Sequence, residues 1–211
     1  MADTANIDGA SGMDTEVVRP VIHPLYVRIT HWINALAMLV MIGSGWQIYN
    51  ASPLFGFTFP RNSLGGWLAG GLLWHFAAMW LLIANGLVYF ILGLATGRFR
   101  RKLLPVRPRE VARDLAAALT GRLSYSDLAR YNAVQKAVYL GTLLVGIVIV
   151  ASGLAIWKPV QFAPLTNLLG GYEAARLVHF FAMAAIVLFL VLHIVMALIV
   201  PKSLRAMILG R

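Results

Sequence analysis

The sequence contains no cysteine. This absence excludes disulfide bonds, thiolate zinc sites, cysteine-ligated iron–sulfur clusters and covalent C-x-x-C-H attachment of a cofactor. Charged residues are also scarce, at 12% of the chain, and only eight of them are acidic. Together these shortages place the chain far from the average composition of a soluble globular domain.

What the chain has instead is apolar sequence. Hydrophobic residues make up 60% of it, and the mean hydropathy is +0.76. Four stretches lack charge for about 20 residues or more, the length that a helix needs to cross a bilayer. We therefore expect an all-α integral membrane four-helix bundle, with spans at residues 26–49, 67–96, 134–157 and 174–200.

The basic residues predict the orientation of this bundle. All but three of the eighteen Lys and Arg fall in the N-terminal tail, the segment between the second and third spans, or the C-terminus. The exceptions are Arg61, Lys158 and Arg176. Because basic residues accumulate on the cytoplasmic side, both termini should be cytoplasmic. This distribution also accounts for the net charge of +10, so we expect no nucleic-acid partner.

Outside the spans, residues 1–22 are polar, acidic and lack the basic and apolar regions of a signal peptide, so we expect a flexible cytoplasmic tail. Residues 23–211 then form one domain, with a cytoplasmic loop at 98–133. In this loop, "REVARDLAAALTG" has apolar residues at helical spacing and a glycine as a stop. The segment is either a helix lying on the inner leaflet or a simple connector.

Four of the five histidines lie inside the expected spans. His179 and His193 are fourteen residues apart on the fourth span, which places them near one helix face and about 21 Å apart along the axis. His31 lies in the cytoplasmic half of the first span, at the depth of His193. His75 lies in the outer half of the second span, at the depth of His179. The histidines therefore form two pairs at two depths.

An imidazole in hydrocarbon is costly unless its nitrogens have partners. Two b haems in the bundle core meet this need, with His31 and His193 ligating an inner iron and His75 and His179 an outer iron. Zinc or copper fits less well, because each depth offers only two ligands. A proton relay would normally use acidic residues, which the spans lack.

Two arginines lie near these ligands. Arg28 and Arg176 each precede a histidine by three residues, one turn nearer to the membrane surface. Either guanidinium could pair with a haem propionate, although an interface anchor explains Arg28 equally well. Glycines within the spans permit close approach of a macrocycle or of another helix.

The opening of the first span, "YVRITHWINALAMLVMIGSG", has an R-x-x-H-W-x-N-A pattern. With one histidine in the second span and two in the fourth, it resembles the bacterial cytochrome b561, nickel–iron hydrogenase cytochrome b and formate dehydrogenase gamma superfamily. The last of these is similar at "RYNAVQKAVY", residues 130–139. The resemblance implies a dihaem electron carrier that exchanges electrons between membrane quinone and a partner, with the four paired histidines as ligands.

In formate dehydrogenase relatives the quinone pocket lies beside the cytoplasmic haem. The resemblance therefore makes Asn132 and Gln135 candidates to hydrogen-bond a quinone carbonyl, with Tyr131 and Lys136 near by. The alternative is that these residues face water at a helix start. His23 is either an interfacial residue or a proton acceptor for quinol.

The leading function is a membrane anchor and electron conduit, in the bacterial inner membrane, for a periplasmic oxidoreductase. The outer loops resemble those of cytochrome subunits that accompany molybdopterin enzymes of the sulfite-oxidase type. Their aromatic residues could dock such a partner or anchor the lipid interface: Trp46, Phe55, Phe57, Phe59, Trp157 and Phe162. One alternative is a stand-alone superoxide:quinone oxidoreductase that uses Arg61, Lys158 and Arg176 as a cationic funnel. Another is a non-redox haem or metal transporter. The sequence leaves the oligomeric state open.

Overall fold

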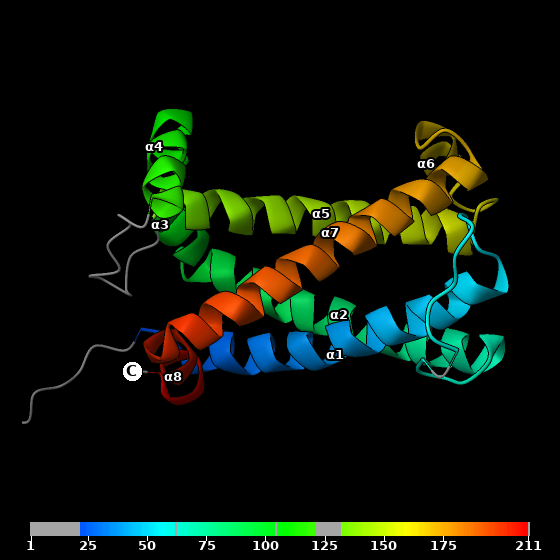
Figure 1. The fold of residues 1–211 in the computed structure, drawn as a ribbon, viewed down its shortest axis with the longest axis horizontal. Helices are drawn as coiled ribbons and strands as arrows, with labels where there is room; N and C mark the ends of the chain where they lie inside the picture. The colour runs from blue at the N-terminus through cyan, green and yellow to red at the C-terminus, as the bar shows by residue number, and fades with distance from the viewer. Residues whose placement is uncertain (1–21, 62, 104, 121–131, 211) are drawn as a thin grey trace, which may run out of the picture.

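The computed structural model describes residues 22–61, 63–103, 105–120 and 132–210, which are helical apart from their connections. Four long helices lie lengthwise, and each is long and apolar enough to cross a membrane: α1 (Leu25–Ala51), α2 (Leu68–Ala95), α5 (Ala133–Trp157) and α7 (Tyr172–Ile199). Four shorter helices lie at their ends: α3 (Arg98–Leu103), α4 (Pro108–Leu119), α6 (Ala163–Leu168) and α8 (Pro201–Leu209) (Figure 1). The all-helical architecture with four long apolar helices is confirmed.

The bundle has two ends, which we name by their short helices. The α8 end holds α8, α3, α4 and the start of α1, and the α6 end holds α6 and the loop between α1 and α2 (Figure 1). α4 is the helix expected from "REVARDLAAALTG", and it runs across the long axis of the bundle. Its expected glycine stop, Tyr131 and the expected tail apart from Ile22 lie outside the described residues.

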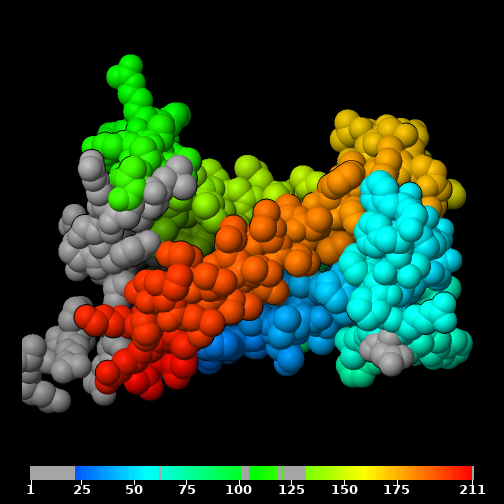
Figure 2. Space-filling view, viewed as in Figure 1, coloured from blue at the N-terminus to red at the C-terminus, as the bar shows by residue number. Residues whose placement is uncertain are grey.

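The long helices pack as two pairs, α1 with α2 and α5 with α7. Close backbone contact between the two pairs is sparse among the described residues. α7 runs obliquely across the face shown in Figure 2, from α6 toward the start of α1. The two pairs therefore meet through side chains rather than through close backbone packing.

Small residues form the seam between α1 and α2. On each helix, three of the four buried residues recur at seven-residue intervals: Thr30, Ala37 and Ser44 on α1, and Gly71, Ala78 and Asn85 on α2. A seven-residue repeat keeps one stripe of each helix facing its partner. Small side chains in that stripe let transmembrane backbones approach closely. The seam therefore fixes the register of the two helices that carry His31 and His75.

One buried polar residue pins this seam. Asn85, 7% exposed, donates its amide hydrogens to the carbonyl of Thr30 at 2.8 Å and to Oδ1 of Asn34 at 2.6 Å. An unpartnered amide in this position would be costly, because no water is available inside the bundle. The register of α1 against α2 therefore depends on Asn85 near His31.

Loop contacts close both ends of the bundle. At the α8 end, the backbone N–H of Ile22 donates to the carbonyl of Gly210 at 2.9 Å, so α8 folds back onto the start of α1. At the α6 end, Asn50 bonds the backbone of Phe59 through both its amide and its carbonyl group. The rings of Tyr49, Phe57, Phe59 and Phe180 pack together there. The α1–α2 loop is thereby held against the start of α7.

We expect Asn85→Ala to lower the thermal unfolding temperature of the detergent-solubilised protein, at a cost of about 1 kcal/mol for the lost interhelical bonds. Asn34→Ala should add little in the double variant, because both changes break the same contact. Asn167→Ala, an exposed site on α6, is the matched control. If Asn85→Ala unfolds at the same temperature as the wild type, Asn85 does not stabilise the contact between α1 and α2.

Candidate functional site: two facing histidine pairs

The four histidines within the long helices face one another in the two pairs expected from the sequence. His31 on α1 and His193 on α7 lie toward the α8 end, with ring centroids 5.9 Å apart. His75 on α2 and His179 on α7 lie toward the α6 end, with ring centroids 6.5 Å apart. Each pair joins the α1–α2 half of the bundle to α7. The facing imidazoles therefore connect the two helix pairs.

These separations suit two axial ligands of one metal ion. With a metal–imidazole bond of about 2 Å on each side, the centres of two opposed rings lie about 6 Å apart. In the described part of the chain, no third His, Cys, Asp or Glu joins either pair. Two protein ligands leave a bare ion short of its usual coordination, whereas a haem macrocycle supplies the four remaining positions itself. The residues present therefore fit a haem at each pair.

The two rings at the α6 end are held by hydrogen bonds on Nδ1. The Nδ1 of His75 lies 3.1 Å from Oγ of Ser44, and the Nδ1 of His179 lies 3.1 Å from Oγ of Ser152. The carbonyl of Ile149 is a second partner of His179, also at 3.1 Å. These bonds leave Nε2 of each ring as the nitrogen available to a metal.

Two glycines allow these rings to approach the neighbouring helix. A Cβ added at Gly45 would lie 3.5 Å from Cε1 of His75, and one at Gly153 would lie 3.3 Å from Cε1 of His179. The second distance is tighter than an ordinary contact. The α6-end rings are thus packed against main chain as well as hydrogen-bonded.

The rings at the α8 end have a different setting. His31 meets Trp32 edge to face, with centroids 5.4 Å apart, and His193 stacks on Phe189 at 5.6 Å. Within residues 22–61, 63–103, 105–120 and 132–210, neither ring has a hydrogen-bond partner. Aromatic packing orients this pair, whereas serine hydroxyls orient the other.

The two arginines near the ligands contact main-chain carbonyls. Arg28 donates through Nη2 to the carbonyl of Ile208, near the end of α8, and its Nε is buried without a described partner. Arg176 donates to the carbonyl and hydroxyl of Ser52, at the end of α1, and pairs with Glu173 at 2.9 Å. Propionate binding by either arginine stays a prediction.

Asn132 and Gln135 cap the start of α5. The Asn132 side-chain oxygen accepts from the backbone N–H of Gln135 at 2.7 Å, and the Gln135 side-chain oxygen accepts from the backbone N–H of Asn132 at 3.1 Å. This reciprocal capping box uses both side-chain oxygens. It gives the residues a structural role beside the quinone role predicted for them.

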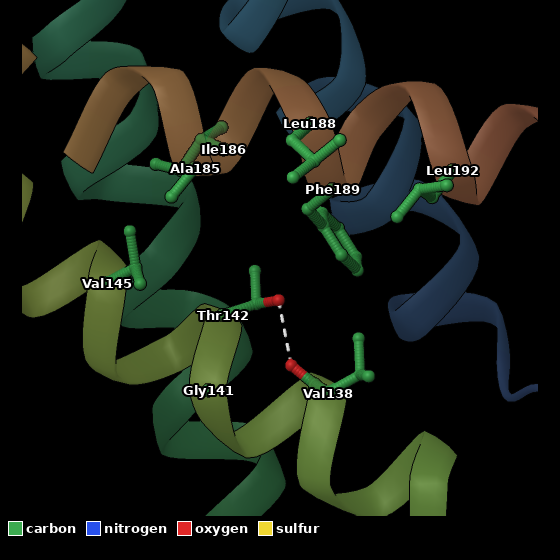
Figure 3. Close-up of a pocket in the computed structure, with 9 residues that line it drawn as sticks. All are labelled: Val138, Gly141, Thr142, Val145, Ala185, Ile186, Leu188, Phe189 and Leu192. Carbon is green, nitrogen blue, oxygen red and sulfur yellow. Dashed lines mark hydrogen bonds between the residues drawn. The ribbon is translucent and has the colours of Figure 1, made fainter. Parts of the chain in front are cut away.

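An apolar groove opens between α5 and α7, one turn beyond this cap (Figure 3). Its volume is about 250 Å³. Phe189, which stacks on His193, forms part of the wall, and the hydroxyl of Thr142 is turned to the carbonyl of Val138 at 2.8 Å. The groove is lined by Val138, Gly141, Thr142, Val145, Ala185, Ile186, Leu188, Phe189 and Leu192.

The remaining candidates from the sequence lie at the two ends. His23 is 9% exposed, and its Nδ1 lies 3.3 Å from Nη2 of Arg98, at the α8 end. Of the outer aromatic residues, Trp46 and Phe59 stack on each other at 4.8 Å. The others are exposed by more than a third: Phe55, Phe57, Trp157 and Phe162.

Paired imidazoles inside an apolar helical bundle, in a chain without cysteine, define a membrane cytochrome of the b type. Comparison with known proteins gives the particular family. Residues 22–210 match the family model described as prokaryotic cytochrome b561, and the chain belongs to this family. The resemblance seen in the sequence is thereby confirmed.

Two curated relatives illustrate the family. The putative protein-methionine-sulfoxide reductase subunit YedZ1 of Azospira oryzae is 52% identical over 190 residues, which cover 90% of this chain and 96% of the relative. The formate dehydrogenase cytochrome b556(fdo) subunit of Escherichia coli K12 is 25% identical over 188 residues, covering 87% of this chain and 81% of the relative. No solved structure matches the chain significantly.

Sequence reasoning missed Ser44 and Ser152 as partners of the histidines. A usable signal was present, because each serine is followed by a glycine in the middle of an apolar span, the "SG" of "MIGSG" and of "IVASG". Asn85 was missed too, although it is an uncharged polar residue in the most apolar part of the second span.

We expect Gly153→Val to reduce the haem content of the purified protein, because the added side chain must displace the ring of His179. Mutation of the groups that orient a metal-ligating histidine typically lowers metal affinity by about 10- to 100-fold. Leu144→Val introduces the same side chain on the opposite face of α5, at a site 56% exposed, and should bind haem normally. Equal haem content in both variants would argue against close packing at Gly153.

Proposed function

We propose that this protein is a dihaem electron-transfer subunit of the bacterial inner membrane, which passes electrons between quinone at the α8 end and a periplasmic redox partner at the α6 end. The observation that carries the proposal is the facing of four imidazoles in two pairs, 5.9 and 6.5 Å apart, at two depths of one bundle. When bound, each haem supplies a one-electron Fe(III)/Fe(II) couple.

The protein's own contribution is to fix the positions of the two sites and to exclude water from them. α7 carries one ligand of each pair, so a single rigid helix sets the spacing of the two sites at about 21 Å. The seam between α1 and α2 fixes the opposing ligands. The apolar spans exclude water from both sites, which limits side reactions with solvent.

The distribution of basic residues supports the assignment of the α8 end to the cytoplasmic side of the membrane. Exposed Lys202 and Arg205 lie on α8, and exposed Arg109 and Arg113 lie on α4, all at the α8 end. Because basic residues mark the cytoplasmic face, the pair His31–His193 faces the cytoplasm in this proposal.

The groove between α5 and α7 supports a quinone site at this end. A quinone requires an apolar slot for its ring and donors for its oxygens. The groove is apolar, and Phe189 in its wall stacks on His193. Asn132 and Gln135 lie one to two turns away and retain amide N–H groups, because the capping box uses their oxygens.

The α6 end supports the docking of a partner. Its exposed aromatic residues lie in the loops and, for Trp157, at the last residue of α5: Phe55, Phe57, Trp157 and Phe162. The relative from Azospira oryzae is described as a subunit of a putative protein-methionine-sulfoxide reductase. By analogy with this relative, we propose that the partner of the present chain is a periplasmic molybdopterin oxidoreductase of the sulfite-oxidase type.

The direct test is haem stoichiometry together with dithionite-reduced minus oxidised spectra of the purified protein. We expect two b haems per chain in the wild type and one after either His75→Ala or His193→Ala, because each removes one axial ligand of one site. His23→Ala, outside both pairs, should retain two. A wild type that is free of haem after expression with ample haem supply would overturn the proposal. Rapid reduction by superoxide but not by quinol would instead favour the stand-alone superoxide:quinone oxidoreductase.

A second test separates capping from quinone binding. Asn132→Ser and Gln135→Glu keep residues that suit a capping box but remove the amide donors. We expect both variants to melt with the wild type and to oxidise quinol more slowly, by about 10-fold for a lost hydrogen bond of about 1.4 kcal/mol. Wild-type quinol kinetics in both variants would remove these residues from the quinone site.

A further inference from the structure

The α6-end histidines rest on two copies of one local arrangement. Residues 40–45, "VMIGSG", and residues 148–153, "VIVASG", share a valine, a serine and a glycine at the same spacing. In both, the serine is wholly buried and its hydroxyl donates to the valine carbonyl four residues earlier, at 2.6 Å for Ser44 and 2.7 Å for Ser152. We call each copy a serine–glycine cradle.

The cradles fix the direction of the hydrogen bonds to the rings. Because each serine hydrogen is directed to a helix carbonyl, the serine oxygen is left to accept. His179 Nδ1 also faces the carbonyl of Ile149, which can only accept. Nδ1 therefore carries the hydrogen in both rings. The Ser44 oxygen receives it from His75, and the Ser152 oxygen and the Ile149 carbonyl receive it from His179.

Among the residues that the structure describes, the α8-end rings have no such cradle. Trp32 and Phe189 lie against His31 and His193, and their rings offer no oxygen to an Nδ1–H group. The same ligand type is therefore placed in two electronically different settings within one bundle.

We propose that Ser44 and Ser152 are positioning residues that lower the reduction potential of the α6-end haem by hydrogen-bonding its two axial histidines. An Nδ1–H group that donates to an oxygen makes the imidazole a stronger electron donor through Nε2. A stronger donor stabilises the ferric over the ferrous iron, and ligand hydrogen bonding is one of the means by which proteins set haem potentials. This inference rests on the proposed function.

The test is a spectroscopic redox titration of the purified dihaem protein with Ser44→Ala, Ser152→Ala and the double variant. Alanine leaves the helix unbroken, since each hydroxyl only supplements the helix hydrogen bonds. We expect one of the two haems to become easier to reduce, by about tenfold in its ferrous-to-ferric ratio in the double variant, or about 59 mV. The other haem should titrate as in the wild type.

Thr120→Ala is the matched control. Its hydroxyl makes the same bond to a carbonyl four residues earlier, that of Ala116, on α4 and away from both histidine pairs and the groove. Neither haem potential should move in this variant. Ser44→Cys and Ser152→Cys keep a weak acceptor of similar size, so the potential should shift in the same direction by less. These variants decide the question if the alanine variants bind haem poorly.

Each outcome bears on the proposal. Unchanged potentials in the double variant, or equal shifts of both haems, would overturn it. To assign the shifted component, the titration is repeated in the His193→Ala background, which should retain only the α6-end haem. If the serine substitutions raise the reduction potential of the remaining haem in this background, the proposal is supported. If they leave that potential unchanged, it is overturned. A wild-type protein without haem would instead overturn the proposed function.

Discussion

The structure depends on one constraint: four imidazoles lie in an apolar bundle, where each ring nitrogen needs a partner other than water. At the α6 end the serine–glycine cradles give Nδ1 of each ring a partner and leave Nε2 available to a metal. At the α8 end aromatic rings hold the histidines, and the ring separation is similar. A haem at each pair, as proposed, would give one nitrogen of every ring its partner.

The helix packing follows from the way in which the two histidine pairs are held. α1 and α2 are joined by a seam of small residues, and α5 and α7 pack on each other through the second cradle. Two arginines connect the halves near the ends of the bundle. Arg28 on α1 donates to the carbonyl of Ile208 on α8, and Arg176 on α7 donates to the carbonyl of Ser52 at the end of α1. The two pairs of facing histidines lie between these contacts.

Much of this arrangement could be predicted from the sequence, and the reasons are physical. Runs without charge locate helices in a membrane protein, and helix geometry alone pairs His31 with His193 and His75 with His179. The observed ring separations agree with that pairing. Helices α3, α6 and α8 are not predicted from the sequence, because each is shorter than the window in which a periodic pattern is readable.

The partners of the functional side chains were harder to predict. Asn132 and Gln135 have the spacing of a capping box, a role that neither of their predicted roles, as quinone donors or as residues facing water, includes. Arg28 and Arg176 were expected at propionates or at the interface, and their carbonyl partners lie 180 and 124 residues away in the chain. Such contacts depend on tertiary packing, which spacing along one helix does not reveal.

An experimental structure of the haem-loaded protein in lipid nanodiscs tests the central claim most directly. We predict one macrocycle between α1 and α7, ligated by His31 and His193, and a second between α2 and α7, ligated by His75 and His179. A single macrocycle, or an iron ligated by any other pair of side chains, would contradict the account.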